Sequence, residues 1–249
     1  MKNKETIGIL QFGCAKNLVD AELMLGALAQ NGHEITLDEN NADVVVCGAY
    51  EVDGDKKVDI DHFDDTIKNI QKRYVCNRPS AWCKLIKKDI LLKNKLYFLE
   101  GRIYEDISVM PSYALFTDKI EFVNESLYYY LVRSGSIMNQ KVYKKNLEDI
   151  FVSLENLKKI FKENNGYQKF CEELEFLHIK HLLHAASLRF LPYKEGEVSL
   201  EKINMIMKVE FPKWKKNKYY KKENVKYKII CNLIYAKKYN LLRKILKIN

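Results

Sequence analysis

The strongest constraint on the fold is a short β-branched run in the first fifth of the chain. Val44-Val45-Val46-Cys47 is entirely apolar, with Asp43 on one side and Gly48 on the other. A run of this length between polar and turn-forming residues is typical of a buried β-strand. The sequence therefore predicts a sheet with this strand in its interior.

Two further strands are predicted before this run, with a helix between them. Thr6–Phe12 is apolar and is followed by Gly13, and His33–Leu37 is the second candidate strand. Between them, Val19–Gln30 has apolar residues at helical spacing, and Asn31-Gly32 follows as a C-terminal cap. The order strand, helix, strand favours an α/β unit with parallel strands.

The rest of the chain divides into a mixed part and a helical part. Asp53–Asp65 is acidic and is predicted to be a loop, and Ser80–Leu92 is predicted to be a helix. Strands are predicted at Asp118–Val123 and Ser126–Val132. From Leu147 onward the apolar spacing is helical, which predicts helices at Leu147–Phe161, Tyr167–Leu191, Ser199–Val209 and Tyr227–Ile248.

Together these patterns predict the α/β class: a mixed sheet with flanking helices, then a mostly helical C-terminal region. The same patterns predict that the chain divides into three segments, residues 1–41, 42–146 and 147–249. No apolar stretch approaches the roughly 18 residues that a transmembrane helix needs. The polar start lacks the apolar core of a signal peptide, and none of the six cysteines forms a Cys-x-x-Cys pair, so we expect reduced thiols in a cytoplasm.

The positive charge is concentrated in the C-terminal tail. The net charge is +9, but residues 211–249 contain twelve lysines, one arginine and one glutamate, so the remainder is slightly acidic. The aromatic residues among these lysines are Trp214, Tyr219, Tyr220, Tyr227, Tyr235 and Tyr239. The tail, residues 213–247, is interpreted as a solvated helix face or as a contact with an anionic membrane surface, and less readily as a nucleic-acid contact.

The candidate chemistry centres on Glu105-Asp106, within Gly101-Arg102-Ile103-Tyr104-Glu105-Asp106. Adjacent carboxylates are costly to bury together, so at least one is expected to face solvent or a cleft. A carboxylate in a cleft can take a proton from a sugar hydroxyl, and Arg102 and Arg133 can hold phosphate oxygens. The structural alternative is a helix cap, with Asp106 as the N-cap residue.

A wider pattern around this pair resembles the acceptor-side half of family 2 glycosyltransferases. It comprises Trp82-x-Lys84-Leu85, the Glu-Asp segment, Pro111, and the run from Tyr128 to Met138. The resemblance extends over about residues 38–249. It implies a truncated sheet of the glycosyltransferase-A type, with Asp106 as the general base and Glu105 beside it. It also implies acceptor contacts from Trp82, Lys84, Arg102, Tyr104 and Arg133.

The same resemblance implies a nucleotide sugar as donor and a polysaccharide or lipid-linked sugar as acceptor. A divalent metal, manganese or magnesium, is expected in the family on an Asp-x-Asp motif in its nucleotide-binding half. That half has no counterpart here. The triplets Asp53-Gly54-Asp55 and Asp59-Ile60-Asp61 fit the letters, but they follow the predicted strand and are interpreted as solvated charge.

The first forty residues instead resemble the radical-SAM methylthiotransferases. The resemblance covers about residues 5–46 and lies in Gly13-Cys14-Ala15-Lys16-Asn17, followed by Asp20 and Glu22. It implies Cys14 as a ligand of an auxiliary iron–sulfur cluster. The radical-SAM Cys-x-x-x-Cys-x-x-Cys motif has no counterpart, and a cluster needs three or four thiolates, so we do not expect one here. Both resemblances include the run at Ala42–Val46, which suggests a join between two sequences of different origin.

His178, His181 and His184 form a further candidate set, spaced three residues apart. On an α-helix the outer two splay by about 120°, which favours packing over metal binding. Three hypotheses remain open: an active glycosyltransferase, a non-catalytic remnant of that family, and a methylthiotransferase fragment. The expected location is the cytoplasm, with peripheral association at the inner face of the plasma membrane if the tail binds lipid.

Overall fold

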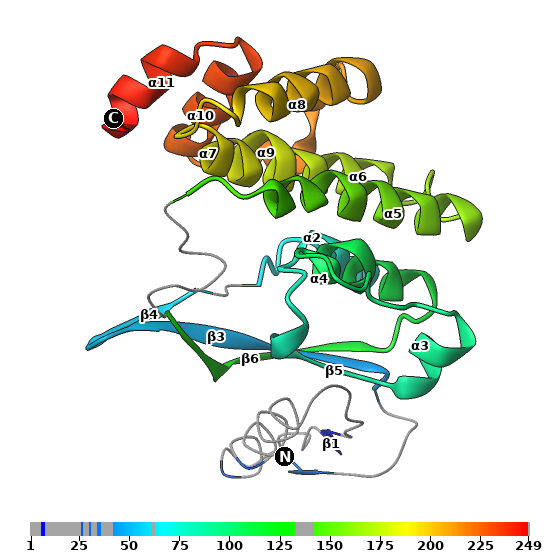
Figure 1. Ribbon diagram of the computed structural model, residues 1–249. Coiled ribbons are helices and arrows are strands. Elements are labelled where there is room, and N and C mark those ends of the chain that lie inside the picture. Colours follow the sequence, from blue (N-terminus) through cyan, green and yellow to red (C-terminus); the bar gives the residue numbers. More distant parts are fainter. Residues whose placement is uncertain are drawn as a thin grey trace. The chain divides into compact units, whose positions relative to one another are not determined.

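The computed structural model describes residues 6–7, 26, 30, 34–35, 42–60, 63–132 and 142–248. Cys14 and Arg133 therefore lie outside the described residues. The chain divides into two compact units (Figure 1). The sheet unit comprises Met1–Phe98 and Val109–Asn139, and the helical unit comprises Leu99–Ser108 and Gln140–Asn249. The division into segments 1–41, 42–146 and 147–249 stays a prediction.

Strand β3 is the centre of the main sheet, because it pairs with each of the other three strands. β3 (Val44–Asp53) is parallel to β6 (Ile120–Leu131) and antiparallel to β4 (Lys56–Asp59) and β5 (Lys84–Ile86). Since β6 follows one edge of β3, the two antiparallel strands share the other edge. The first six residues of β3 are buried, which confirms the predicted interior strand and the mixed sheet.

Two short strands near the N-terminus form a separate parallel pair. β1 (Thr6–Ile7) pairs with β2 (Glu34–Ile35), with Thr6 opposite Glu34 and Ile7 opposite Ile35. Both strands lie within the predicted strand segments. Their parallel orientation confirms the expected direction of the two strands. Most of the predicted helix Val19–Gln30 between them lies outside the described residues.

Several predictions of local structure in the sheet unit are wrong. The supposed loop Asp53–Asp65 begins as a β-hairpin, in which Gly54 adopts φ 57° and Asp53, Asp55 and Asp59 are exposed. Ser80–Leu92 contains a 3₁₀ turn η1 (Ala81–Cys83), strand β5 and helix α3 (Lys88–Lys93) instead of one helix. The two predicted strands at 118–132 are one strand, β6. Helix α2 (Ile70–Cys76) was not predicted.

The two long strands meet at a β-bulge around Gly48. The register between β3 and β6 shifts on both sides of this residue. A Cβ atom at Gly48 would lie 2.7 Å from the Ser126 hydroxyl oxygen and 3.1 Å from the Glu125 carbonyl oxygen. These separations are shorter than van der Waals contact, so the close approach of the strands requires glycine here.

The helical unit confirms the predicted helical C-terminal region. The predicted helix Tyr167–Leu191 is helical from Cys171 to Phe190, and its middle, η5, is a π-helix. The predicted helix Tyr227–Ile248 is interrupted, because Lys237 adopts a left-handed φ of 55°. The larger elements are α4 (Glu105–Val109), α5 (Asp149–Glu163), α6 (Cys171–His178), η5 (Ile179–Ala186), α7 (Ser187–Phe190), α8 (Glu197–Glu210), α9 (Lys218–Lys222), α10 (Val225–Tyr235) and α11 (Tyr239–Leu246).

The core of the helical unit is aromatic and aliphatic. Phe161 of α5 and Phe170 are fully buried and meet edge to face, with ring centroids 5.4 Å apart. Trp214 is 1% exposed. Among the described residues, no helix combines the length and apolarity needed to cross a membrane.

Replacing Gly48 by alanine tests the bulge. The new methyl group would collide with Ser126 and with the main chain of β6, so we expect Gly48→Ala to lower the free energy of unfolding by about 1–3 kcal/mol. Urea unfolding measures the change. Ser126→Ala removes one colliding atom, so in that background Gly48→Ala should cost less. An equal cost in both backgrounds would contradict the proposed contact.

Candidate functional site

The segment that carries Glu105-Asp106 is a turn followed by a short helix. Gly101 and Tyr104 both have positive φ, 69° and 64°. Glycine tolerates this conformation at little cost, whereas a tyrosine needs compensating contacts. The backbone then enters α4 at Glu105. Glu105 is exposed and Asp106 is half-buried.

The carboxylate of Asp149, the first residue of α5, holds this segment within the helical unit. It accepts a hydrogen bond from Arg102 Nη1 at 2.8 Å and another from the Ile103 main-chain N–H at 3.2 Å. The Asp149 side chain is only 13% exposed, so this ion pair is better shielded than a typical surface pair. The predicted acceptor residue Arg102 thus has a structural partner, and its role toward a ligand stays a prediction.

Two further contacts fix the same segment. The guanidinium of Arg189, on α7, donates to the hydroxyl of Tyr104 at 2.5 Å. The amide of Asn156, on α5, donates to the Ser108 carbonyl oxygen at 3.3 Å. Burial raises the pKa of Tyr104, although Arg189 opposes this shift. The segment is therefore anchored before and after the Glu-Asp pair.

Asp106 is the second residue of α4, so its predicted position as the N-cap is wrong. Its carboxylate accepts a hydrogen bond from the Ile107 N–H at 2.8 Å. A negative charge in the first turn of a helix is stabilised by the exposed N–H groups there. The half-buried carboxylate remains a chemically suitable proton acceptor.

The other described site residues, Trp82 and Lys84, belong to the sheet unit. Trp82 stacks on two rings of β6, with centroids 4.6 Å from Tyr128 and 5.4 Å from Tyr130. Lys84 is buried, and its ammonium donates to the carbonyl oxygens of Arg78 and Ser80 at 2.5 and 2.7 Å. The Lys84 ammonium is thus hydrogen bonded to carbonyl groups of the loop that precedes it. The predicted acceptor contacts of both residues stay predictions.

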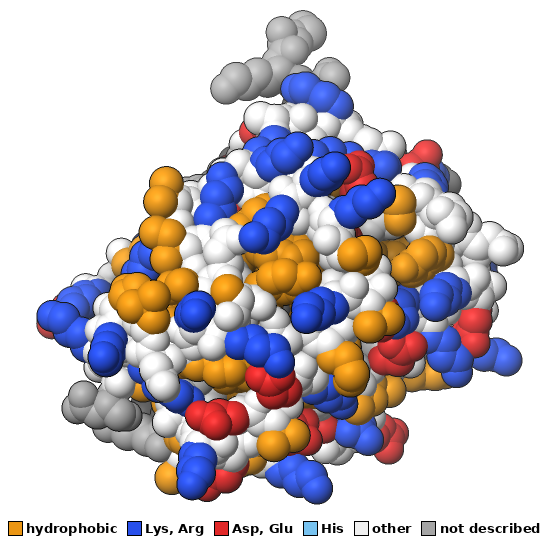
Figure 2. Space-filling model, turned by 90° about the horizontal axis from the view of Figure 1, so that it is seen from above, with side chains coloured by type: hydrophobic (Ala, Val, Ile, Leu, Met, Phe, Trp, Pro, Cys, Tyr) orange, Lys and Arg blue, Asp and Glu red, His pale blue; other side chains and the backbone are white. Residues whose placement is uncertain are grey.

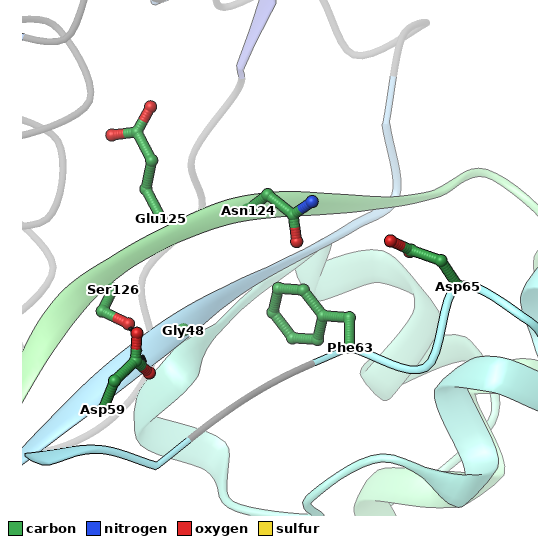
Figure 3. Close-up of a pocket in the computed structure, with 7 residues that line it drawn as sticks. All are labelled: Gly48, Asp59, Phe63, Asp65, Asn124, Glu125 and Ser126. Carbon is green, nitrogen blue, oxygen red and sulfur yellow. Dashed lines mark hydrogen bonds between the residues drawn. The ribbon is translucent and has the colours of Figure 1, made fainter.

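A polar cavity of about 250 Å³ lies beside the β-bulge of the sheet unit (Figure 3). Asp59 accepts a hydrogen bond from Ser126 across it at 3.0 Å, and Asp65 forms an ion pair with Arg73. Sequence reasoning missed this cavity, because nothing in the order of residues shows that the Asp59 and Ser126 side chains come together there. Its lining residues are Gly48, Asp59, Phe63, Asp65, Asn124, Glu125 and Ser126.

The described residues contain no group of three His, Cys, Asp or Glu side chains that could share a metal ion. Asp53 and Asp55, one of the predicted triplets, are exposed at the turn of the β3–β4 hairpin. Cys47 is buried in β3, with its sulfur 3.6 Å from the Cys83 carbonyl oxygen. Cys14 and Asp61, which belong to the predicted sets, lie outside the described residues. The expectations about a divalent metal and an iron–sulfur cluster therefore stay predictions, and no reaction step is assigned to either.

Of the three histidines of the helical unit, His178 is buried and His181 and His184 are half-buried. His178 lies 4.5 Å from the Phe211 ring and hydrogen bonds to the Leu174 carbonyl oxygen, and His184 stacks on Tyr227 at 4.0 Å. Burial lowers the pKa of His178 and of His184 to about 4, and it lowers the pKa of His181 well below the usual value. All three are therefore neutral packing groups at neutral pH.

Two different sets of known proteins are similar to parts of this chain. Uncharacterized protein family UPF0004 matches residues 6–72. Ribosomal protein uS12 methylthiotransferase RimO of Trichlorobacter lovleyi is 58% identical over 43 residues, which is 17% of this chain and 10% of that protein. RimO of Geobacter sulfurreducens is 54% identical over 43 residues, with the same coverage. The chain thus spans about a tenth of the RimO proteins that it matches.

Glycosyltransferase GlyG of Streptococcus pneumoniae serotype 4 is 32% identical over 117 residues. The match covers 41% of this chain and 38% of GlyG. Each of the two resemblances seen in the sequence therefore has a counterpart among known proteins. The chain combines a segment similar to UPF0004 and RimO proteins with a partial similarity to a glycosyltransferase.

The buried histidines predict a pH dependence of stability. The folded-state pKa of His184, about 4, is below the unfolded value of about 6.5, so the unfolded chain takes up the proton first. Its stabilising contribution is complete above about pH 6.5 and is lost as the pH falls toward 4. His184→Phe keeps the stacking on Tyr227 and cannot titrate. Between pH 7 and 4.5 this variant should lose about 1–2 kcal/mol less stability than the wild type in urea unfolding. Equal losses would contradict the burial of the neutral ring.

Proposed function

We propose that this chain is a glycosyltransferase-like protein of the family 2 type. It transfers a sugar from a nucleotide sugar to a polysaccharide or lipid-linked acceptor, with Asp106 as the general base. The observation that carries the proposal is the half-buried Asp106 carboxylate at the start of α4, on a segment fixed by Asp149 and Arg189. The partial match to GlyG adds support.

The proposed reaction is a displacement at the anomeric carbon. The acceptor hydroxyl oxygen forms a new bond to this carbon, and the bond from the same carbon to the nucleotide diphosphate breaks. Asp106 takes the proton of the hydroxyl, and the diphosphate leaves with the bonding electrons. This role requires a carboxylate that is accessible and held still. The anchored segment around Asp106 meets the second requirement, because contacts from α5 and α7 restrain both sides of it.

A non-catalytic protein of the same type is the second candidate. It is favoured by the sequence, in which the nucleotide-binding half expected of the family has no counterpart. A third candidate, a methylthiotransferase fragment, is supported by the RimO matches. Cys47, the next cysteine after Cys14 in the sequence, is buried in β3. The first two candidates share the acceptor side and differ in whether a donor nucleotide binds.

Donor binding and base catalysis can be measured separately. Titration calorimetry with UDP, with and without manganese, tests donor binding. Release of UDP from a panel of UDP-sugars tests transfer. Asp106→Asn should retain UDP binding and lose about 100-fold or more in the rate of release, since a general base contributes about that much.

Glu100→Gln is the matched control, because Glu100 is an exposed carboxylate in the same segment and no role is assigned to it. This variant should keep the wild-type rate. Absence of UDP binding in the wild type would overturn the proposal in favour of the non-catalytic candidate. An Asp106→Asn variant that transfers sugar at the wild-type rate would remove Asp106 as the base.

A further inference from the structure

The aromatic side chains of the first part of the basic tail belong to the core. Trp214, Tyr219 and Tyr220 are 1%, 5% and 4% exposed. Trp214 meets Tyr220 and Tyr235 edge to face, at 4.8 and 5.4 Å. The sequence placed these rings among the lysines as possible contacts with a partner. The structure corrects that interpretation, because rings buried in this way cannot stack on bases or lie among lipid headgroups.

Aliphatic side chains occupy several of the exposed positions of the last two helices. Val225 and Ile229 of α10 are 73% and 46% exposed, and Leu241 and Ile245 of α11 are 49% and 53% exposed. Each pair is spaced four residues apart, so its two members share one face of their helix. We call these four residues the aliphatic set. Leu242 of α11 is fully buried, so this helix is anchored by its inner face.

Exposed lysines accompany the aliphatic set on the same two helices and at their ends. Some basic groups of the tail have acidic partners, such as Lys237 with Glu201 and Arg243 with Glu197. Figure 2 shows one face of the molecule, on which Lys and Arg side chains lie between exposed hydrophobic groups and outnumber acidic ones. Four exposed lysines next to the aliphatic set form the lysine set: Lys226, Lys238, Lys244 and Lys247.

This combination of side chains distinguishes between two anionic partners. Binding of single-stranded nucleic acid uses a basic groove together with exposed aromatic faces on which bases stack. Here lysines and aliphatic groups are exposed, Trp214, Tyr219 and Tyr220 are buried, and Tyr227, Tyr235 and Tyr239 are half-buried. A bilayer surface offers both complementary components, namely phosphate headgroups for lysines and acyl chains for aliphatic side chains. Charge complementarity together with exposed aliphatic groups therefore favours lipid.

We propose that α10 and α11 form a peripheral docking surface for an anionic lipid bilayer. The lysine set binds the headgroup phosphates, and the aliphatic set enters the boundary between headgroups and acyl chains. The tail charge of +12 supplies the attraction over a distance. This surface goes beyond the proposed sugar transfer and does not depend on it.

Sedimentation with vesicles tests the proposal. The full chain should bind phosphatidylglycerol-containing vesicles at least tenfold more tightly than phosphatidylcholine vesicles, and salt should weaken the binding. Replacing the lysine set by glutamine should weaken binding at least tenfold. The matched control replaces four exposed lysines of the sheet unit, Lys56, Lys68, Lys88 and Lys95, with the same loss of charge. It should weaken binding by less than threefold.

A second variant tests the aliphatic set without changing the charge. Leu241→Gln with Ile245→Gln alters two exposed side chains, so circular dichroism should show an intact fold. This variant should bind anionic vesicles at least fivefold more weakly and should bind a single-stranded oligonucleotide as the wild type does. The proposal is overturned by equal binding to both kinds of vesicle, by equal losses in the two lysine variants, or by unchanged vesicle binding of the aliphatic variant. Tighter binding to the oligonucleotide than to anionic vesicles would also overturn it.

Discussion

The carboxylate of Asp149 determines which unit carries the candidate site. It binds Arg102 and the main chain of Ile103 at the start of α5, and it thereby holds residues 99–108 in the helical unit. The residues before and after this segment belong to the sheet unit. The Glu-Asp pair is thus fixed by contacts with residues about fifty to eighty positions later in the chain. A site of this kind depends on the folding of the helical unit, whatever its reaction.

Much of the fold could be predicted because burial leaves a regular pattern in the sequence. The apolar run at Val44 and the helical spacing of α5 and α8 each identified an element that the structure contains. Predictions failed where the decisive interaction lies far away in the sequence. The acidic segment Asp53–Asp65 suggested a loop, yet residues 56–59 of it pair with β3 as strand β4. One left-handed residue, Lys237, divides the last predicted helix, and the surrounding pattern does not show it.

The candidate site was predictable only in part. The sequence identified Glu105-Asp106 as chemically distinctive, but its structural alternative, with Asp106 as the N-cap, differs from the structure, where Asp106 is the second residue of α4. It could not show that Asp149 binds Arg102, that the Lys84 charge is satisfied by its own loop, or that Trp214 is buried. Each of these facts depends on long-range packing. The sequence shows which chemical groups are present, whereas the packing of the folded chain determines which of them are accessible to a partner.

The most direct test of the Asp149 anchor is hydrogen–deuterium exchange of residues 99–108 in Asp149→Ala. The Ile103 N–H loses its acceptor in this variant, and the Arg102 guanidinium loses its ion pair. Glu163→Ala, at the exposed far end of α5, is the control. The account predicts faster exchange of 99–108 in Asp149→Ala alone, with the rest of α5 still protected. Unchanged protection of 99–108 in that variant would contradict it.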